Sequence, residues 1–174
     1  MRLFIAINFS EVTRLALTTL RDDLQKQSKG GNFTLAENIH LTLAFLGECN
    51  TKQTADAVTA IDATATLFKP FTIEIERIGR FKRNGGDIWW AGIRENKPLL
   101  CLQQDLTNRL IALGFSLETR KYSPHITLGR QVITSMKERT LTPIAETVTK
   151  IDLMQSMRVD GKLTYVPIHR KNIQ

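Results

Sequence analysis

Apolar and polar residues alternate with a period of two in several parts of the chain, and this pattern predicts β-strands. In Pro70–Arg77 the apolar residues occupy one face, and threonine and glutamate occupy the other. A strand with one solvated face is typical of antiparallel sheets. The expected strands are Arg2–Phe9, a segment of Asn38–Glu48 ending at Gly47, Pro70–Arg77, Ile88–Arg94, a segment of Ser123–Arg130, Thr147–Met157 and Lys162–Ile168.

In three other segments apolar residues recur every three or four positions, which predicts amphipathic helices. The first helix begins after Ser10, a favourable N-cap, and runs to about Ser28. The second covers about Lys52–Phe68, and the third begins at Pro98 and reaches Leu113. The residues expected to form the buried stripe of the first helix are Val12, Leu15, Ala16, Leu20 and Leu24.

Two segments show neither period. We expect Lys29–Asn32 to be a flexible loop, and we assign no element to Thr134–Thr142. Strands and helices alternate along the chain, but the strands have the one-sided pattern of antiparallel sheets. The predicted fold class is therefore α+β over residues 1–174, with mostly antiparallel sheets flanked by helices.

Two of the expected strands contain the same short motif, about half a chain apart. The first copy is His40-Leu41-Thr42-Leu43 and the second is His125-Ile126-Thr127-Leu128, so two of the three histidines begin a copy. In a strand, residues i and i+2 share a face, so each histidine lies beside its threonine, and the aliphatic residues take the buried face. The repeat predicts two lobes related by an approximate twofold axis, with a cleft between them.

The same alternation makes predictions for two residues that follow the motifs. Phe45 has the parity of the buried leucines and is expected on the core face. Arg130 falls on the face opposite to its histidine and reaches a phosphate only if Gly129 bends or ends the strand.

Two imidazoles that face one phosphorus atom suit phosphodiester chemistry. One can take a proton from the nucleophile while the other gives a proton to the leaving oxygen. The ordinary histidine pKa of about 6.5 makes both protonation states available near neutral pH. The hydroxyls of Thr42 and Thr127 can donate hydrogen bonds to the non-bridging phosphoryl oxygens.

Further candidates lie near the expected β-hairpin around Asn84-Gly85. Phe81 is flanked by basic residues and could stack on a base while they bind phosphates, or it could lie beneath a solvated turn. Tyr122 is a second stacking candidate. Trp89 and Trp90 point to opposite faces, so one is expected in the core and the other beside the cleft. The third histidine, His169, lacks the motif and is interpreted as a surface or structural residue.

Composition limits the class of protein. The apolar fraction of 42% and charged fraction of 24% are typical of a globular domain, and no apolar run approaches the ~18 residues of a membrane span. We identify no secretory signal and no C-x-x-C pair, so we expect a cytoplasmic protein with free thiols, no metal and no cofactor. The net charge of +7 favours a polyanionic partner such as RNA.

The motifs resemble those of the two-histidine phosphoesterase superfamily, and in particular the RNA 2',3'-cyclic phosphodiesterases, also called LigT-like proteins or 2'-5' RNA ligases. The resemblance rests on Arg2–Phe9, His40–Glu48, Pro124–Arg130 and Gly161–Ile168. It implies the same bilobal fold and hydrolysis of RNA 2',3'-cyclic phosphate ends, or of small cyclic nucleotides, to 2'-phosphates.

The resemblance also implies roles for individual residues. His40 would be the proton donor and His125 the proton acceptor, Thr42 and Thr127 would hold the phosphoryl oxygens, and Arg130 would lie near the substrate phosphate. We expect the protein to act as a monomer.

Three alternatives stay open at this point. The same site could join RNA ends through a 2'-5' linkage, because the reaction is reversible in principle. The chain could be a non-catalytic module that binds RNA ends, although binding alone would more naturally use arginine or lysine. The three histidines could also form a zinc site, although nothing in their spacing requires one.

Overall fold

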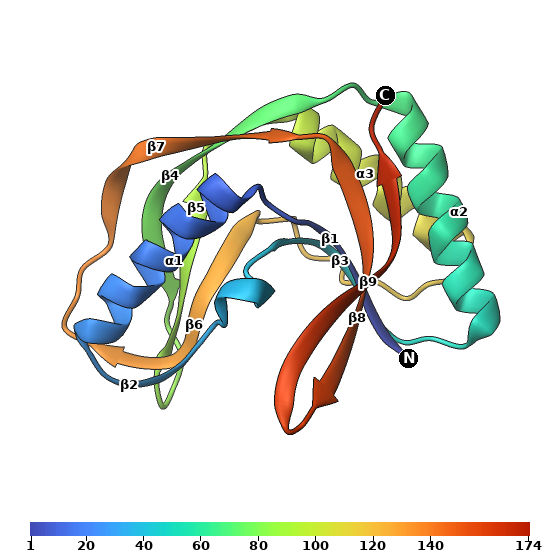
Figure 1. Ribbon diagram of the computed structural model, residues 1–174. Coiled ribbons are helices and arrows are strands. Elements are labelled where there is room, and N and C mark those ends of the chain that lie inside the picture. The colour runs from blue at the N-terminus through green and yellow to red at the C-terminus, as the bar shows by residue number, and fades with distance from the viewer.

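The computed structural model describes residues 1–174 and contains two antiparallel sheets and three α-helices (Figure 1). The helices are α1 (Glu11–Lys26), α2 (Thr51–Leu67) and α3 (Lys97–Ala112), with a short 3-10 helix, η1 (Ala36–Asn38). The strands are β1 (Arg2–Ile7), β2 (Ser28–Phe33), β3 (Leu41–Glu48), β4 (Phe71–Phe81), β5 (Asp87–Ile93), β6 (His125–Thr134), β7 (Arg139–Val148), β8 (Lys150–Val159) and β9 (Lys162–Asn172). The predicted α+β class is confirmed.

The two sheets have corresponding strand orders. The first sheet has the order β3-β1-β8-β9, and the second has the order β2-β6-β5-β4-β7. Apart from β2, the four strands of one sheet match the four of the other, so β3 corresponds to β6 and β1 to β5. The two motif strands, β3 and β6, lie against each other where the sheets meet. The expected cleft between the lobes stays a prediction.

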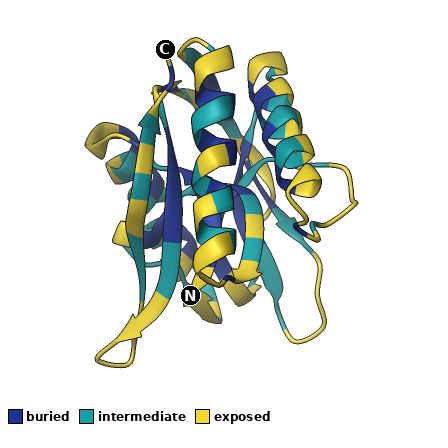
Figure 2. Ribbon diagram, turned by 90° about the vertical axis from the view of Figure 1, so that its right-hand side faces the viewer, coloured by how far each residue is buried: buried dark blue, intermediate teal, exposed yellow.

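Each sheet buries one face against helices and exposes parts of the other. Helix α2 packs on β8 and β9, and α1 packs on β2, β6 and β7. Helices α2 and α3 lie side by side on one side of the molecule (Figure 2). The buried faces are aliphatic, and Leu41, Leu43, Ile126 and Leu128 of the motif strands all belong to the core, as predicted.

The buried stripe predicted for α1 is partly wrong. Val12 and Leu15 are 81% and 69% exposed, whereas Thr13 and Leu17 are buried. The cause is an anchor at the start of the helix. The Glu146 carboxylate of β7 accepts hydrogen bonds from the Ser10 backbone N–H (2.7 Å), the Ser10 hydroxyl (2.9 Å) and the Thr13 hydroxyl (3.1 Å). This contact turns Thr13 inward, and the two apolar neighbours therefore face outward.

The prediction of a loop at Lys29–Asn32 is wrong, because these residues belong to β2 and pair with β6. The strand has little apolar pattern because it is an edge strand. A Cβ at Gly31 would lie 3.1 Å from both Phe33 and Val132, so glycine allows the close approach of the two strands here.

Two other boundaries differ. The unassigned segment before Pro143 contains the start of β7, and the expected strand Thr147–Met157 is divided between β7 and β8. No helix is long and apolar enough to span a membrane. Cys49 is buried and Cys101 exposed, and both are free thiols. The hairpin of β8 and β9 projects from the body of the molecule, and its tip is exposed (Figures 1 and 2).

Candidate active site

His40 lies between η1 and β3 and is held through both ring nitrogens. Its Nδ1 lies 2.7 Å from the backbone carbonyl oxygen of Asn38, and its Nε2 lies 2.8 Å from the Thr42 hydroxyl. A carbonyl can only accept, so Nδ1 carries a proton, and in the neutral ring Nε2 accepts from Thr42. The ring packs between Phe4, at 5.0 Å between centroids, and Tyr165, at 5.3 Å.

His125, the first residue of β6, is held in the same way through one nitrogen. Its Nδ1 lies 2.7 Å from the backbone carbonyl oxygen of Ser123, again two residues earlier in the chain. Its Nε2 makes no hydrogen bond within the protein. The ring packs against Phe81, at 5.1 Å between centroids, and Trp90, at 6.5 Å. Both rings are thus fixed by the same backbone contact through Nδ1, whereas Nε2 contacts Thr42 in His40 and has no partner in His125.

Both imidazoles have a pKa below the ordinary value of 6.5. Burial is the main cause, because it disfavours the charged ring, while the carbonyl of Asn38 or Ser123 opposes the shift. The positive charge of Arg130 lowers the pKa of both rings, and the charge of His125 further lowers that of His40. The guanidinium and the two imidazoles therefore lie within electrostatic reach of one another.

A β-bulge follows the threonine in each motif. In the first sheet, Thr42 lies opposite Ala6 and Ala44 opposite Ile5, which leaves Leu43 as the extra residue. In the second sheet, Thr127 lies opposite Trp90 and Gly129 opposite Trp89, which leaves Leu128 as the extra residue. An extra residue reverses the facing of the side chains that follow it.

The bulges correct the prediction for Phe45 and explain the position of Arg130. Phe45 is 65% exposed and packs against Phe4, on the face that carries His40, so its assignment to the core face is wrong. Arg130 occupies the equivalent place in the second motif, five residues after the histidine, and its charge lowers the pKa of both imidazoles. The strand neither ends nor bulges at Gly129, the condition set for Arg130 to reach a phosphate, and the bulge at Leu128 changes the facing of Arg130 instead.

Tyr122 connects the two motifs. Its hydroxyl donates a 2.7 Å hydrogen bond to the backbone carbonyl of Thr42, and its ring packs against the core. Burial raises the pKa of this phenol, so it remains a donor at physiological pH. The contact fixes β3 relative to the segment that leads into His125.

Trp89 and Trp90 point to opposite faces of β5, as predicted. Trp89 is fully buried in the core. Trp90 lies on the face of His125 but is only 6% exposed, because its ring lies across two glycines. A Cβ would lie 2.5 Å from the ring at Gly79 and 2.8 Å from it at Gly92.

The basic residues around Phe81 do not act as one group. Arg80 lies over Trp89 and pairs with Asp87 at 3.2 Å and with Glu138 at 3.8 Å. Arg83 lies over the Phe81 ring, with its guanidinium carbon 5.7 Å from the centroid, and forms no ion pair. Phe81 itself is neither a free loop residue nor fully buried, since its ring meets His125 edge to face.

His169, the third histidine, lies away from His40 and His125 and contacts helix α2. Its Nε2 is 2.7 Å from a carboxylate oxygen of Asp62 on α2, which agrees with a structural role. No group of three His, Cys, Asp or Glu side chains is arranged to hold a metal ion. The structure therefore does not bring the three histidines together as a zinc site would require.

Sequence reasoning missed Phe4 and Tyr165, which enclose His40. Both lie in segments on which the family resemblance rests but outside the two histidine motifs, and their proximity to the histidine comes from the register of β1, β3, β8 and β9. Their shared face could be inferred only after the pairing of these strands was known.

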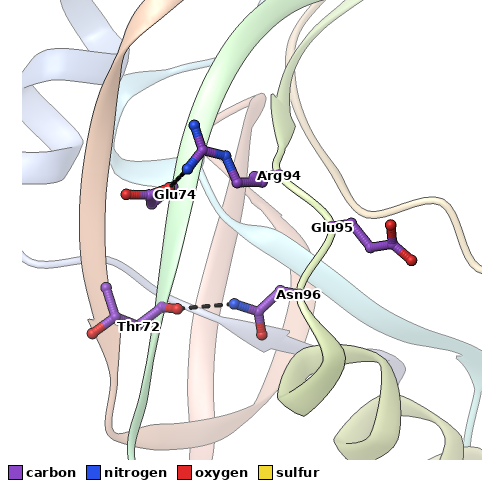
Figure 3. Close-up of a pocket in the computed structure, with 5 residues that line it drawn as sticks. All are labelled: Thr72, Glu74, Arg94, Glu95 and Asn96. Atoms are coloured by element: carbon purple, nitrogen blue, oxygen red, sulfur yellow. Dashed lines mark hydrogen bonds and ion pairs between the residues drawn. The ribbon is translucent and has the colours of Figure 1, made fainter.

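A cavity of about 210 Å³ lies away from the histidines, where β5 leads into α3 (Figure 3). The polar side chains that line it form ion pairs and a helix cap with one another and with their neighbours. Arg94 pairs with Glu74, and Asn96 donates to the Thr72 carbonyl (Figure 3). Arg94 also pairs with Glu76, and the Asn96 side chain caps α3 by accepting from the Leu99 N–H. We assign this cavity no catalytic role.

The fold and the paired histidines define a class of protein, the phosphoesterases that carry one histidine on each of two sheets. Comparison with known proteins is consistent with this class. The profile of the family LigT like Phosphoesterase matches residues 8–90. The RNA 2',3'-cyclic phosphodiesterase of Thermotoga maritima is 34% identical over 75% of this chain and 70% of its own. The protein of that name from Escherichia coli (strain K12) is 28% identical over 97% and 94%.

Solved structures of LigT-like proteins have the same fold as this chain. The complex of Escherichia coli LigT with 3'-AMP has a TM-score of 0.81 and 27% identity, covering 99% of this chain and 97% of its own. The protein TT0787 of Thermus thermophilus has a TM-score of 0.87 at 24% identity over 99% and 98%, which supports the fold alone. This chain belongs to the family of LigT-like phosphoesterases.

Proposed function

We propose that this protein hydrolyses RNA 2',3'-cyclic phosphate ends to 2'-phosphates without a metal ion, with His40 as the acid and His125 as the base. The proposal rests mainly on one observation. Both imidazoles are fixed by the same Nδ1 contact to a carbonyl two residues earlier, and both lie within electrostatic reach of Arg130. The names of the relatives and the 3'-AMP complex of Escherichia coli LigT support RNA ends as the substrate.

His125 is suited to the role of base. Its Nε2 has no partner in the protein, and burial lowers its pKa, so the neutral form is the main form at neutral pH. This nitrogen takes a proton from water as the water oxygen forms a bond to phosphorus. The attack is in line with the ribose 3' oxygen, which places the two reacting oxygens on opposite sides of the phosphorus.

His40 supplies the proton that the leaving group needs. As the bond between phosphorus and the 3' oxygen breaks, the proton on Nε2 of the His40 imidazolium passes to that oxygen. The free protein disfavours this imidazolium, because burial lowers the pKa of His40. A bound phosphate brings a negative charge next to the ring, which raises this pKa when the substrate is in place. The product is a 2'-phosphate and a free 3' hydroxyl.

The remaining residues hold the substrate. Arg130 and the hydroxyls of Thr42 and Thr127 bind the non-bridging oxygens, where negative charge lies in the transition state. Phe45 and Phe81 offer rings on the histidine faces for a base to stack on. Because the Tyr122 hydroxyl is occupied by Thr42, we assign Tyr122 to positioning that strand rather than to stacking.

The direct test is to incubate the purified protein, in excess EDTA, with a short RNA that ends in a 2',3'-cyclic phosphate. We expect conversion to a 2'-phosphate, and we expect His40→Ala and His125→Ala each to lower turnover by about 10²–10⁴-fold. His169→Ala is the matched control, because this histidine pairs with Asp62 away from the site, and it should retain activity. Full activity of either motif variant, or binding of the RNA without turnover, would contradict the proposal.

A further inference from the structure

Arg77 lies on the histidine face of the second sheet because of a third bulge. The register of β4 shifts between Ile75 and Arg77 against both of its neighbours, β5 and β7. Without the shift, Arg77 would share the buried face of Ile73 and Ile75. With it, Arg77 lies opposite Gly92, and Gly92 lies opposite His125. One row across three strands therefore contains an arginine, a glycine and the proposed base.

The guanidinium of Arg77 rests on the Trp90 ring, 4.8 Å from the centroid. His125 packs beside the same ring. Because Gly92 has no side chain, the Trp90 ring lies over it, and this ring is the surface that Arg77 and His125 both contact along this row. The stacking holds the guanidinium in a defined place without using its hydrogen-bond donors.

Arg77 has no acidic partner, although acidic residues are present nearby. Glu76, next to it on β4, pairs with Arg94 at 2.8 Å. Asp87 and Glu138 both pair with Arg80, and Asp87 also accepts from the Arg83 backbone N–H at 2.9 Å. On β7, the residue opposite Arg77 is the neutral Thr140.

The positive charge continues along the same side of the sheet. Arg83 lies over Phe81 and has no ion pair, and Phe81 packs against both Trp90 and His125. On the first sheet, by contrast, the exposed Lys162 of the β8–β9 hairpin is neutralised by Glu37 at 2.8 Å. Arg77 and Arg83 are thus unpaired cations beside Trp90 and Phe81, the rings that contact His125, whereas the unpaired Arg158 lies on the β8–β9 hairpin of the first sheet.

We propose that Arg77, followed by Arg83, binds the phosphodiesters of the RNA strand on the 5' side of the cyclic end. This inference rests on the proposed function and adds to it that the preferred substrate is an oligonucleotide rather than a mononucleotide. The strand leaves the histidines across the Trp90 ring that covers Gly92, and its next phosphate meets the guanidinium that this ring supports. A planar guanidinium with all its donors free is well suited to this contact.

The test compares kcat/KM for an RNA of several nucleotides that ends in a 2',3'-cyclic phosphate with kcat/KM for a mononucleoside 2',3'-cyclic phosphate. The wild-type protein should prefer the oligonucleotide, and Arg77→Gln should lower the preference ratio by about tenfold, the usual effect of one charge-assisted hydrogen bond. Arg158→Gln is the matched control and should leave the ratio unchanged. Arg158 is an exposed arginine of the β8–β9 hairpin and has no acidic partner.

A second readout separates charge from packing. Affinity for the same RNA carrying a 2'-phosphate should depend less steeply on salt in Arg77→Gln, by about 0.7 in the slope of log K against log salt, as expected for one lost contact to a single strand. Arg77→Lys keeps the charge and should keep most of the slope. Thermal unfolding of each variant checks that Trp90 and the sheet remain folded.

The possible failures are distinguishable. If the wild type hydrolyses neither substrate, the proposed function fails and this inference with it. If it hydrolyses both with equal kcat/KM, or if Arg158→Gln lowers the preference as much as Arg77→Gln does, the inference is overturned while the function stands.

Discussion

The two halves of the site share one backbone arrangement but differ in the side chains around it. In both, a histidine donates from Nδ1 to a carbonyl two residues earlier, a threonine follows, and a bulge comes directly after the threonine. In the first sheet the residue opposite the threonine is the small Ala6, whereas in the second sheet it is Trp90. The repeat therefore fixes where functional atoms lie, while the neighbouring strands decide what each half can do.

The difference is largest five residues after each histidine. Phe45 in the first half and Arg130 in the second occupy equivalent places and face the same way. An aromatic ring is suited to a base, and a guanidinium is suited to a phosphate. Under the proposed function, one repeated backbone thus places a ring for the base and a guanidinium for the phosphate of the same nucleotide.

The largest predicted effect is the loss of activity in the two histidine variants, and the pH dependence of kcat/KM distinguishes the role of one histidine from that of the other. Both have a lowered pKa in the free protein, so kcat/KM should be greatest below pH 6.5, the ordinary value. The base must be neutral and the acid protonated. His125→Ala should therefore lose the acidic limb of the profile and His40→Ala the basic limb, in addition to the large fall in rate. If each variant kept both limbs, the assignment of acid and base would be wrong.

The second prediction is that replacing Arg130 and replacing Phe45 both lower kcat/KM, but that only the Arg130 variant has a shifted pH profile. Arg130→Ala should lower kcat/KM by about 10- to 100-fold. It should also move the limbs to higher pH, because the guanidinium lowers the pKa of both imidazoles. Phe45→Ala should cost about 5- to 100-fold, as expected for loss of one stacked base, and should leave the limbs in place. Equal pH shifts in the two variants would show that they do not differ in the way proposed.

The smallest predicted effect concerns the support of Trp90. Gly79→Ala places a methyl group 2.5 Å from the ring, so we expect a loss of about 1–3 kcal/mol in the free energy of unfolding and a change in tryptophan fluorescence. Gly30→Ala is the control, because a Cβ there meets nothing within 4 Å. Unfolding in urea measures both. Equal stability of the two variants would mean that Trp90 can move away at no cost.

The alternation of apolar and polar residues predicts which face of a strand each side chain occupies, but only as far as the first β-bulge, where the strand has an extra residue. The shared face of each histidine and its threonine, the buried leucines, and the opposite orientations of Trp89 and Trp90 all follow from a period of two. The facing of Phe45 and Arg77 does not, because bulges at Leu43 and near Glu76 reverse it. A bulge depends on the pairing with a distant strand, and that pairing is not encoded in the local pattern.

Two other differences have the same kind of cause. The rotation of α1 comes from Glu146, which is far away in the sequence. Strand β2 has few apolar residues because its pairing with β6, rather than its own burial, makes it a strand. Local sequence indicated the elements, and contacts between distant segments decided their orientation.

The strand order of the first sheet has a consequence for how the protein assembles. Strands β1 and β3 come from the start of the chain and β8 and β9 from its last part, whereas all five strands of the second sheet lie within residues 28–148. During synthesis the sheet that carries His125 can be complete while the surroundings of His40 still lack Tyr165. The first half of the repeat is therefore the last to be finished, and a chain shortened before β8 would keep both motifs in its sequence without being able to build the site.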